Sequence, residues 1–416
     1  MLWVKAGRLL PVHNGGNIRS YHLLRYLQSR HNLTFLSYYD GPRDLEYERE
    51  LRAALPGAVS LCTGRSISSP LARGFDYALN LPRKAPYAVH RFASRVVKEH
   101  IVRRLEEGSC DVAVCDFLDA AVNFPATLPV PAVLFQHNVE SEIWRRKALT
   151  ESHLVRKAVW RLEFEKMLRY EEEAVGRFQH VIAVSEHDRS LMLAWADASR
   201  ISVVPTGVDV QQYRAGPGMR EVEPLVVFVG AMDWEPNVDA VEYFCSAIWP
   251  GVQHQVPSAR FRIVGRNPDG RVRALESESV EVTGSVLSVV EHLRAAAVVV
   301  VPLRIGGGTR LKIYEAMAMS KAVVSTTIGA EGLDVHDGED IMLADDAGAF
   351  AEAVVGLLQS PEQRWQYEKA AHELATRYDW PVIGEKFSQV LEQVAFRRGV
   401  TAEPGFVSRE WPGKVS

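Results

Sequence analysis

Short runs of β-branched and apolar residues alternate with longer amphipathic stretches along almost the whole chain of 416 residues. Strands that alternate with helices are typical of right-handed βαβ units, which build a parallel sheet with helices on both faces. The pattern therefore predicts an α/β fold. With 47% hydrophobic and 24% charged residues, the chain can bury large cores, which excludes disordered and fibrous structures.

The alternation is interrupted once, and the interruption divides the chain into two halves, each with its own strands. The expected strands are Leu2 to Ala6, Leu33 to Tyr39, Val112 to Asp116, Ala132 to His137, His180 to Ser185, Ile201 to Pro205, Leu225 to Val229, Phe261 to Val264, Val280 to Thr283, Ala297 to Pro302, Ala322 to Ser325 and Ile341 to Ala344. The expected helices include Asn17 to Ser29, Ala88 to Glu107 and Glu151 to Gly176. Two domains also suit the chain length, at roughly 100 to 200 residues per domain.

The interruption predicts an interdomain linker, because residues 209–224 contain two glycines and two prolines and little periodic apolar character. We therefore expect a first Rossmann-like domain over residues 1–208 and a second over residues 225–380. A last helix over residues 381–396 follows the sequence YDW. Residues 397–416 are rich in glycine, proline and charge, which predicts a loose tail.

The net charge differs between the two halves. The chain carries 48 Lys+Arg against 52 Asp+Glu, a formal charge of -4, which argues against a protein that coats nucleic acid. Residues 1–210 hold 28 against 24, or +4, and residues 211–416 hold 20 against 28, or -8. A single whole-chain charge therefore hides a basic first half and an acidic second half.

Compartment and membrane topology follow from absent features. The four cysteines lack the spacing of a disulfide framework or a zinc site, and the N-terminal sequence lacks the pattern of a signal peptide. No apolar run reaches the ~20 residues that span a bilayer. We expect a cytoplasmic protein whose contact with the inner face of the plasma membrane is peripheral.

The segment VVVVPLRIGGGTRLKIYE, residues 298–315, is the strongest indication of a ligand site. A buried strand runs into three glycines, and a helix then opens with two cations in its first turn. Glycines let a ligand approach the backbone, the first amides of a helix point outward, and cations add charge, so the segment suits a phosphate or diphosphate. An ordinary strand-to-helix turn with solvated cations is the alternative. The candidate residues are Gly306, Gly307, Gly308, Thr309, Arg310 and Lys312.

Other chemistries lack their residues. The glycine segment matches neither G-x-x-x-x-G-K-[ST] nor G-x-G-x-x-G, so ATPase and dinucleotide sites lose their usual support. The chain has no G-x-S-x-G elbow, no H-E-x-x-H helix and no clustered His/Cys set. It also lacks an Asp-x-Asp pair of the kind that holds a diphosphate through a divalent ion. We expect neither a metal nor a cofactor.

The sequence GGGTRLKIYEAMAMSKAVVSTTIGAEGL resembles the nucleotide-sugar signature of retaining glycosyltransferases of the GT-B fold, family 4 (group 1). The glycine-rich PVHNGGNIRSYHLLRYL is similar to the N-terminal loop of that family. The resemblance covers nearly the whole chain. It implies two Rossmann-like domains that face a central cleft, with the last helix crossing back to the first domain. Within the family, GGNIRSYHLL and MDWEPNVDA look closest to sugar transferases of bacterial exopolysaccharide and exosortase-associated systems.

The resemblance implies a donor site in the second domain. The family motif has two Glu separated by seven residues, and Glu315 matches the second, which in relatives holds the ribose hydroxyls. The first falls at Gly307, so this chain departs from the pattern there. Relatives also carry Arg and Lys after the first strand of this domain, and these are absent. We expect Arg310 and Lys312 to take the diphosphate instead, with Arg304 as a helper. Further donor-binding candidates are Gly230, Gly265 and Leu311.

The first domain contributes a histidine and a glycine loop. His137, at the end of an expected strand, resembles the family's pocket histidine near the anomeric carbon of the sugar. A strand-end histidine satisfied by backbone is the alternative. Gly15 and Gly16 form the loop after the first strand, which faces the same cleft in a doubly wound sheet. Asn17 either caps the following helix or contacts a ligand.

Together with the resemblance, these residues predict transfer of a hexose or N-acetylhexosamine from a nucleotide-diphosphate sugar to a glycan or polyprenyl-linked acceptor. The resemblance implies retention by front-face displacement without a metal, with Arg310, Lys312 and the helix start stabilising the leaving group. Two alternatives stay open: a nucleotide-sugar epimerase or hydrolase of the same fold, and a catalytically quiet nucleotide-sugar-binding protein, which the missing first Glu makes conceivable. A third surface is the stretch 65–104, where nine basic residues and interleaved aromatics predict contact with an anionic membrane. A solvated basic face over a core is the alternative there.

Overall fold

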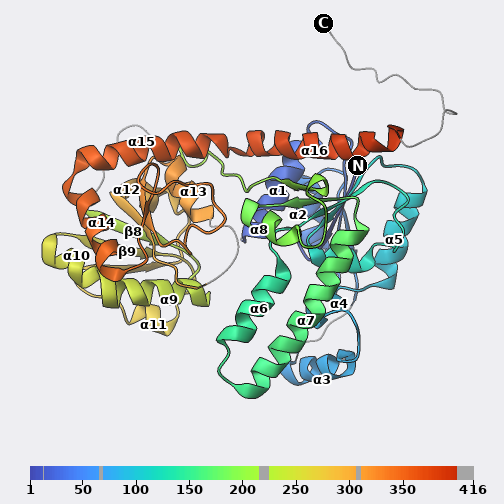
Figure 1. The fold of residues 1–416 in the computed structure, drawn as a ribbon, viewed down its shortest axis with the longest axis horizontal. Coiled ribbons are helices and arrows are strands. Elements are labelled where there is room, and N and C mark those ends of the chain that lie inside the picture. The colour runs from blue at the N-terminus through green and yellow to red at the C-terminus, as the bar shows by residue number, and fades with distance from the viewer. Residues whose placement is uncertain (13, 65–68, 215–223, 306–310, 401–416) are drawn as a thin grey trace, which may run out of the picture.

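The chain folds into two parallel β-sheets flanked by helices (Figure 1). The structure is a computed structural model that describes residues 1–12, 14–64, 69–214, 224–305 and 311–400. Several strands are buried along their whole length, which is typical of parallel sheets covered on both faces. The prediction of two Rossmann-like domains is confirmed.

The first sheet has seven strands in the order β3-β2-β1-β4-β5-β6-β7. Its strands are β1 (Leu2–Ala6), β2 (Thr34–Tyr39), β3 (Val59–Cys62), β4 (Ala113–Asp116), β5 (Ala132–Phe135), β6 (His180–Ala183) and β7 (Ile201–Val203). The second sheet has six, in the order β10-β9-β8-β11-β12-β13. These are β8 (Leu225–Val229), β9 (Arg260–Val264), β10 (Val280–Gly284), β11 (Val298–Val301), β12 (Ala322–Ser325) and β13 (Met342–Leu343).

Both sheets reverse their strand order beside their first strand. In the first sheet the chain moves outward through β2 and β3 and then returns to pair β4 with β1. In the second, β9 and β10 lie on one side of β8, and β11 pairs on the other side. Ligands of doubly wound sheets bind at the carboxyl ends of the strands at such a reversal. The fold therefore marks two corners, one after β1 and β4 and one after β8 and β11.

Polar caps define where many helices begin. The side chains of Asn14, Asp44, Ser94 and Asp346 each accept a hydrogen bond from a main-chain N–H in the first turn of the helix that follows. The helices of the first domain are α1 (Gly15–Gln28), α2 (Leu45–Ala54), α3 (Pro70–Asn80), α4 (Tyr87–His90), α5 (Arg95–Glu106), α6 (Glu140–Thr150), α7 (Leu154–Arg177) and α8 (Glu186–Met192). Those that follow are α9 (Glu235–Tyr243), α10 (Trp249–Gln255), α11 (Gly270–Arg273), α12 (Val290–Ala295), α13 (Leu311–Ala318), α14 (Ala347–Gln359), α15 (Pro361–Arg377) and α16 (Trp380–Val400).

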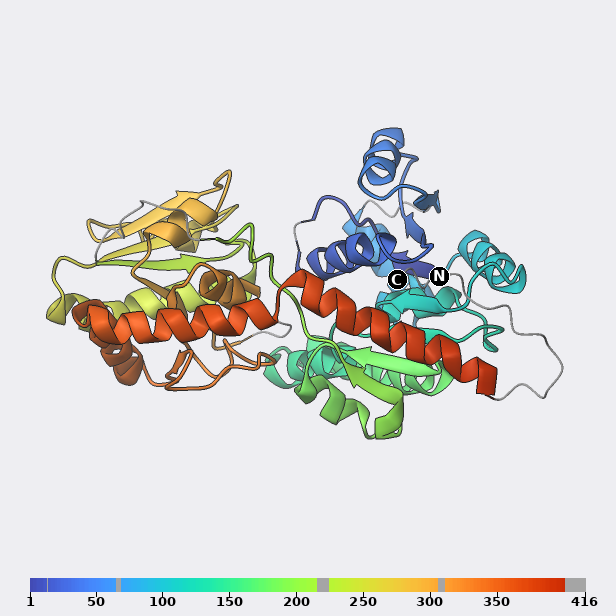
Figure 2. The same cartoon turned by 90° about the horizontal axis from the view of Figure 1, so that it is seen from above.

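The last helix, α16, lies against the first domain although it follows the second in sequence (Figures 1 and 2). Phe387 packs on Trp3 and Phe135, with ring centroids 5.4 and 4.9 Å away. Tyr26 on α1 donates a hydrogen bond to Glu385 (2.7 Å). The same apolar cluster contains core residues of both sheets, so α16 joins the two cores.

The two chain segments that connect the domains are bonded to each other. The Val208 N–H donates to the Tyr378 carbonyl at 2.8 Å, and the Trp380 N–H donates to the Val208 carbonyl at 3.2 Å. A Cβ on Gly207 would lie 2.5 Å from the Trp380 ring, so the close approach requires glycine. The first part of the expected linker is thus ordered, while residues 215–223 lie outside the described part of the chain.

Three elements differ from the sequence prediction. Strand β3 was not expected, because this edge strand is short and only partly buried and shows little pattern. The expected helix Ala88 to Glu107 is two helices, α4 and α5, since Ser94 caps a new helix inside it. Helix α16 continues four residues beyond the expected end, through residues assigned to the loose tail, because the sequence reaches no proline before Pro404. Among the described residues, no helix is long and apolar enough to cross a membrane.

Candidate active site at two sheet corners

The corner of the second sheet is built around two glycines in close contact. Gly230 follows β8 and Gly265 follows β9, and the Gly230 N–H donates to the Val264 carbonyl at 3.0 Å. A Cβ on Gly265 would lie 1.6 Å from the Gly230 carbonyl oxygen, which no side chain can tolerate. The ends of β8 and β9 therefore lie closer together than a side chain at position 265 would permit.

Lys312 on α13 lies over this glycine pair. Its Nζ would be 2.9 Å from a Cβ built on Gly230, and it donates to Asn237 Oδ1 at 2.9 Å. It also lies 4.3 Å from the centroid of the Phe228 ring. Asn237 is itself fixed, because its amide donates to the Ala231 carbonyl at 2.9 Å. The structure thus brings together Lys312, Gly230 and Gly265, which the sequence predicted separately, and it holds the ammonium group at the carboxyl ends of the strands.

Glu315 lies one turn after Lys312 on the same helix. The Tyr213 hydroxyl donates to its Oε1 at 2.9 Å. Burial raises the pKa of Glu315, and the Tyr213 hydrogen bond and the Lys312 charge oppose that shift. Tyr213 belongs to the segment that connects the domains, so this segment packs on the predicted ribose-binding residue.

The remaining donor candidates divide into two groups. Gly306, Gly307, Gly308, Thr309 and Arg310 lie outside the described residues, so the expected diphosphate turn and the departure at Gly307 stay predictions. Arg304 pairs with Asp239 on α9 (2.5 Å) and lies over the Tyr243 ring (4.3 Å). In this conformation Arg304 is engaged on the flank of α9, and its help with a diphosphate requires that this pair opens.

Across from this corner, the N-terminus of α1 faces the start of α13. A Cβ on Gly15 would lie 3.5 Å from Leu311 Cδ1, so residues predicted for the two sides of the cleft meet. Gly15 and Gly16 are the first residues of α1 rather than a loop. Asn14 caps the helix, accepting from the Asn17 N–H at 2.8 Å, and Asn17 donates to the Arg8 carbonyl (3.2 Å). The residue that caps α1 is therefore Asn14, and the predicted capping by Asn17 is wrong.

His137 lies two residues beyond the end of β5 and is fully engaged. Arg19 donates from Nη1 to His137 Nδ1 at 2.7 Å, and His137 Nε2 lies 2.8 Å from Asp116 Oδ1. Because a guanidinium has no acceptor, Nδ1 must be the accepting nitrogen, and the proton resides on Nε2, which donates to the carboxylate. Burial lowers the pKa of His137 to about 3, against the effect of the Asp116 hydrogen bond. The ring is neutral, and a direct bond to a sugar requires that one of its two partners leaves.

Asp116, at the end of β4, is the centre of this network. It accepts from the Trp3 indole N–H (3.0 Å) and pairs with Lys5 (3.7 Å), and all three side chains are buried. Burial alone would raise the pKa of Asp116, but Lys5 and the His137 hydrogen bond hold it well below its usual range. Arg19 donates on its other side to Thr206 (3.0 Å). Lys5 thus pairs with Asp116 directly, and Arg19 is linked to the same carboxylate through His137.

Phe117 follows in a conformation that is unusual for a residue with a side chain, with φ at 70°. Its ring stacks on His137, with centroids 3.5 Å apart and planes at 13°. A Cβ on Gly16 would lie 2.4 Å from Phe117 Cζ, so Gly16 makes room for this ring. Phe117 was not predicted, because an apolar residue after a strand is typical of the hydrophobic core.

Two carboxyl groups near this network also escaped prediction. Burial raises the pKa of Asp119 to about 6. Burial, together with the charges of Asp119 and Glu171, raises the pKa of Glu140 to about 7. Groups with shifted pKa values gather at functional sites, so both are candidates that only the fold could show.

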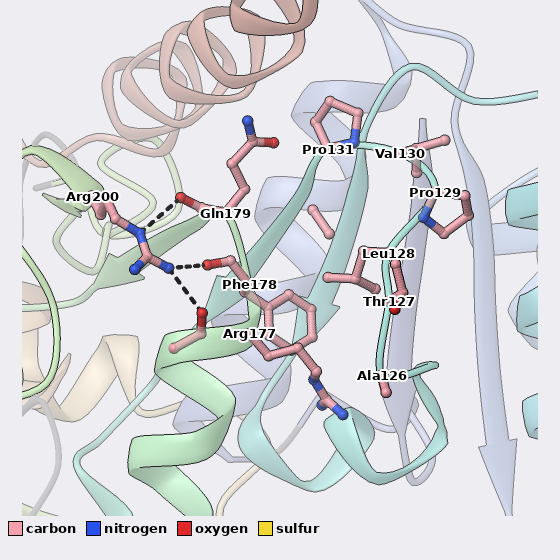
Figure 3. Close-up of a pocket in the computed structure, with 12 residues that line it drawn as sticks. Ala126, Thr127, Leu128, Pro129, Val130, Pro131, Arg177, Phe178, Gln179 and Arg200 are labelled. Carbon is pink, nitrogen blue, oxygen red and sulfur yellow. Dashed lines mark hydrogen bonds between the residues drawn. The ribbon is translucent and has the colours of Figure 1, made fainter.

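The depression in Figure 3 is a different place. Its lining includes residues 126–131, Phe178, Gln179 and Arg200, which precede strands β5, β6 and β7. Arg200 donates to the carbonyls of Phe178 and Gln179 and so closes these loops. Ligands of such sheets bind at the opposite, carboxyl ends. We assign this depression a structural role. Among the residues that the structure describes, no group of three or more His, Cys, Asp or Glu side chains is arranged to hold a metal ion.

Each half of the chain matches a known protein family. Residues 13–212 match the family described as Glycosyltransferase Family 4, and residues 223–360 match the family described as Glycosyl transferases group 1. The chain belongs to the family 4 glycosyltransferases of the GT-B fold. The family model of the first half includes the corner of His137, and that of the second half includes the corner of Lys312.

Relatives of this family 4 glycosyltransferase were found both by sequence and by structure. The phosphatidyl-myo-inositol mannosyltransferase of Mycobacterium leprae is 29% identical over 243 residues, which span 56% of this chain and 63% of that protein. Anabaena HepE, solved with UDP and glucose, superposes with a TM-score of 0.65 at 14% identity, covering 94% of this chain and 98% of its own. Sucrose-phosphate synthase from Thermosynechococcus elongatus gives a TM-score of 0.68 at 16% identity, with coverage of 94% and 98%. The solved structures establish the GT-B fold.

Proposed function

We propose that this glycosyltransferase moves a hexose or N-acetylhexosamine from a nucleotide-diphosphate sugar to a glycan or lipid-linked acceptor, with retention and without a metal, in the synthesis of a bacterial cell-surface polysaccharide. The observation that carries the proposal is Lys312 Nζ held over the Gly230–Gly265 contact at the corner of the second sheet. Glycine removes side chains where a ligand must touch the backbone, and the ammonium supplies positive charge in a domain that is otherwise acidic.

The named relatives favour this chemistry. A structural neighbour binds UDP and glucose, and curated relatives transfer mannose to phosphatidyl-myo-inositol, which is a lipid. The chain covers less than two thirds of those relatives, so the sugar and the acceptor are our inference. A lipid-linked acceptor also accounts for a peripheral contact with the inner face of an anionic plasma membrane.

The described residues divide the reaction between them. Lys312 offsets the charge that builds on the diphosphate as the bond to the sugar breaks. The ribose hydroxyls displace the Tyr213 hydroxyl from Glu315 and donate hydrogen bonds to its carboxylate. Retention then follows front-face displacement, in which the acceptor oxygen bonds to the anomeric carbon on the side that the phosphate leaves, and a phosphate oxygen takes the acceptor proton. His137, which is neutral, and Asp116, which is ionised, lie on the opposite side of the site, in the first domain.

The test is a binding and transfer assay on matched lysine variants. We expect Lys312→Met to weaken the affinity for the preferred nucleotide sugar by about 10- to 100-fold, the range of a hydrogen bond to a charged group. Lys369→Met, at an exposed ion pair on α15, is the control and should bind as the wild type does. Thermal shifts with a panel of UDP and GDP sugars identify the donor, and NMR of the product reports the anomer.

Four results would contradict the proposal. Equal affinity in Lys312→Met and the wild type would remove Lys312 from the donor site. Loss of transfer in excess EDTA would contradict the metal-free reaction. Isomerised or free sugar without any acceptor would identify an epimerase or hydrolase, and nucleotide binding without turnover on native lipid acceptor would identify a quiet binding protein.

A further inference from the structure

Large apolar side chains are exposed together at one end of the first domain. Helix α3 and the hairpin of α6 and α7 extend to this end, away from α16 (Figure 1). Eight of the 18 large hydrophobic residues that are exposed in the described part of the chain lie on these segments. They are Leu71, Phe75, Leu79, Leu81, Leu149, Leu154, Val155 and Leu162. We call this set the apolar end.

Helix α3 presents one apolar face outward. Leu71, Phe75 and Leu79 are spaced four residues apart and therefore lie on one side of the helix, and Leu71 is 88% exposed. The opposite side contacts α7, because the Tyr77 hydroxyl donates to buried Glu163 at 3.2 Å. The N–H of Tyr87, at the start of α4, donates to the same carboxylate at 2.9 Å. The outward face is therefore held in place by the polar contacts behind it.

The hairpin adds a second apolar group. Leu149 ends α6, and Leu154 and Val155 begin α7, with exposures of 63%, 82% and 68%. Lys166 on α7 donates to the Leu81 carbonyl at 2.7 Å, so the hairpin and the segment after α3 are joined. Residues that are about 80 positions apart in the sequence thus form one surface.

The charge around the apolar end is positive. Arg83 and Lys84 after α3 and Arg156, Lys157 and Arg161 on α7 are all exposed. Three carboxylates on these segments are engaged, and one of them, Glu165, pairs with Arg161 at 3.7 Å. Asp76 accepts from the Tyr87 hydroxyl (2.7 Å), and Glu151 accepts from the His153 N–H (2.9 Å). Apolar side chains ringed by cations fit a bilayer with anionic headgroups, whereas a protein interface is depleted in charge and lysine.

We propose that the apolar end of α3 and the α6–α7 hairpin is the surface by which this protein docks on an anionic lipid bilayer. This proposal rests on the proposed function, because it identifies the membrane from which a lipid-linked acceptor is taken. Helix α6 starts three residues after His137 and ends at the hairpin tip, so its 11 residues span ~16 Å. Docking therefore brings the first corner of the active site within about one short helix of the headgroups.

The surface coincides only in part with the basic stretch 65–104 that the sequence suggested, because it includes α3 but not α5. Tyr77 and Tyr87 of that stretch face inward, and their rings pack on each other at 5.3 Å. Arg95, Lys98 and Arg103 lie on α5, which Figure 1 shows away from α3 and the hairpin tip. The hairpin, which lies outside the stretch, takes the place of α5.

The test is flotation of the full chain with vesicles of phosphatidylcholine alone or mixed with phosphatidylglycerol. We expect binding to the mixed vesicles only. Phe75→Ser with Leu79→Ser, and separately Leu154→Ser with Val155→Ser, should each weaken binding by at least about tenfold, and Arg156→Glu with Lys157→Glu should weaken it about as much. Leu287→Ser, at an exposed leucine of the second domain, and Lys98→Glu with Arg103→Glu on α5 are the controls that should bind as the wild type does.

Several results would overturn the proposal. One is vesicle binding that is unchanged in the apolar-end variants, and another is vesicle binding that is lost only in the α5 variant. A third is that the wild type binds no vesicles but self-associates, and that the apolar-end variants abolish this self-association. The nucleotide-sugar thermal shift of each variant should equal that of the wild type, which shows that it is folded. If vesicle binding follows the prediction but no nucleotide sugar is bound or transferred, the proposed function fails and the docking surface stands.

Discussion

The two corners of this GT-B protein lie at the same point of the same topology but are built in opposite ways. The first corner is filled with side chains: Lys5, Arg19, Asp116 and His137 are buried and satisfy one another. The second is built by removing side chains, since Gly230 and Gly265 touch through their backbones and leave Lys312 above them. The side chains of the first corner are thus already paired with one another, whereas the second corner leaves backbone and one ammonium group, which is why we propose it as the donor site.

The largest effect should come from breaking the paired corner. Asp116→Asn leaves Lys5 buried without its counter-charge, and we expect a loss of about 3 to 5 kcal/mol in the free energy of unfolding, measured by urea titration. Asp239→Asn removes the partner of the more exposed Arg304 and should cost less than about 1 kcal/mol. Equal losses in the two variants would mean that the first corner is no more tightly coupled than the surface.

The glycine corner should break on the addition of one methyl group. Gly265→Ala places a Cβ against the Gly230 carbonyl, and we expect a loss of about 1 to 3 kcal/mol of stability together with the nucleotide-sugar thermal shift. Gly270→Ala, where a Cβ meets nothing within 4 Å, serves as the control and should retain both. A stable Gly265→Ala protein that binds nucleotide sugar normally would refute the role given to this contact.

The pH dependence of stability sharpens the description of the first corner. His137 has a pKa of about 3 in the folded protein and 6.5 in the unfolded chain, so between these values the unfolded state binds a proton that the folded state does not. Stability should therefore fall as the pH is lowered through this window, by up to about 1.4 kcal/mol per pH unit from this residue. In His137→Gln that loss is absent. Asp119 and Glu140 contribute to the pH dependence with the opposite sign, but they do so in both proteins. Subtracting the stability curve of His137→Gln from that of the wild type therefore removes their contributions, and the difference should not change with pH above 6.5.

The smallest effect on stability should come from an ion pair between the two domains. Arg146 on α6 donates to Glu331, which follows β12, at 3.1 and 2.9 Å, and so bridges the domains. Arg146→Gln should change stability by only about 0.2 to 1 kcal/mol but should enlarge the radius of gyration measured by X-ray scattering. Arg145→Gln is the matched control, because Arg145 pairs with Glu142 within α6. An unchanged radius in Arg146→Gln would show that this ion pair does not set the domain separation.

The sequence predicted the glycine corner better than the paired one. β1, β8 and β12 have the expected bounds, because β-branched runs flanked by turns define them locally. Gly230, Gly265 and Lys312 were each recognisable from their positions after strands or at a helix start. Tyr213 as the partner of Glu315 was not, because 102 residues separate the two.

The paired corner was largely invisible. Arg19 and Asp116 reach His137 across 118 and 21 residues, and nothing in a linear pattern indicates that a charged residue will be buried. His137 was found, but its two bonds and its tautomer depend on those partners. The α3 half of the apolar end lies within the stretch 65–104 that the sequence indicated, but the hairpin half was not predicted, since the helix that carries Phe75 and the hairpin that carries Leu154 meet only in the folded chain.

The position of α16 constrains how the protein is made. Trp3 and Phe135 complete their packing against Phe387, which is synthesised after every strand of both sheets. During translation the first domain emerges from the ribosome with that groove uncovered, although domains tend to fold as they emerge. The first domain must therefore wait for the whole second domain to be synthesised before its core is closed, and a chain that is truncated before α16 presents exposed aromatic rings to chaperones and proteases.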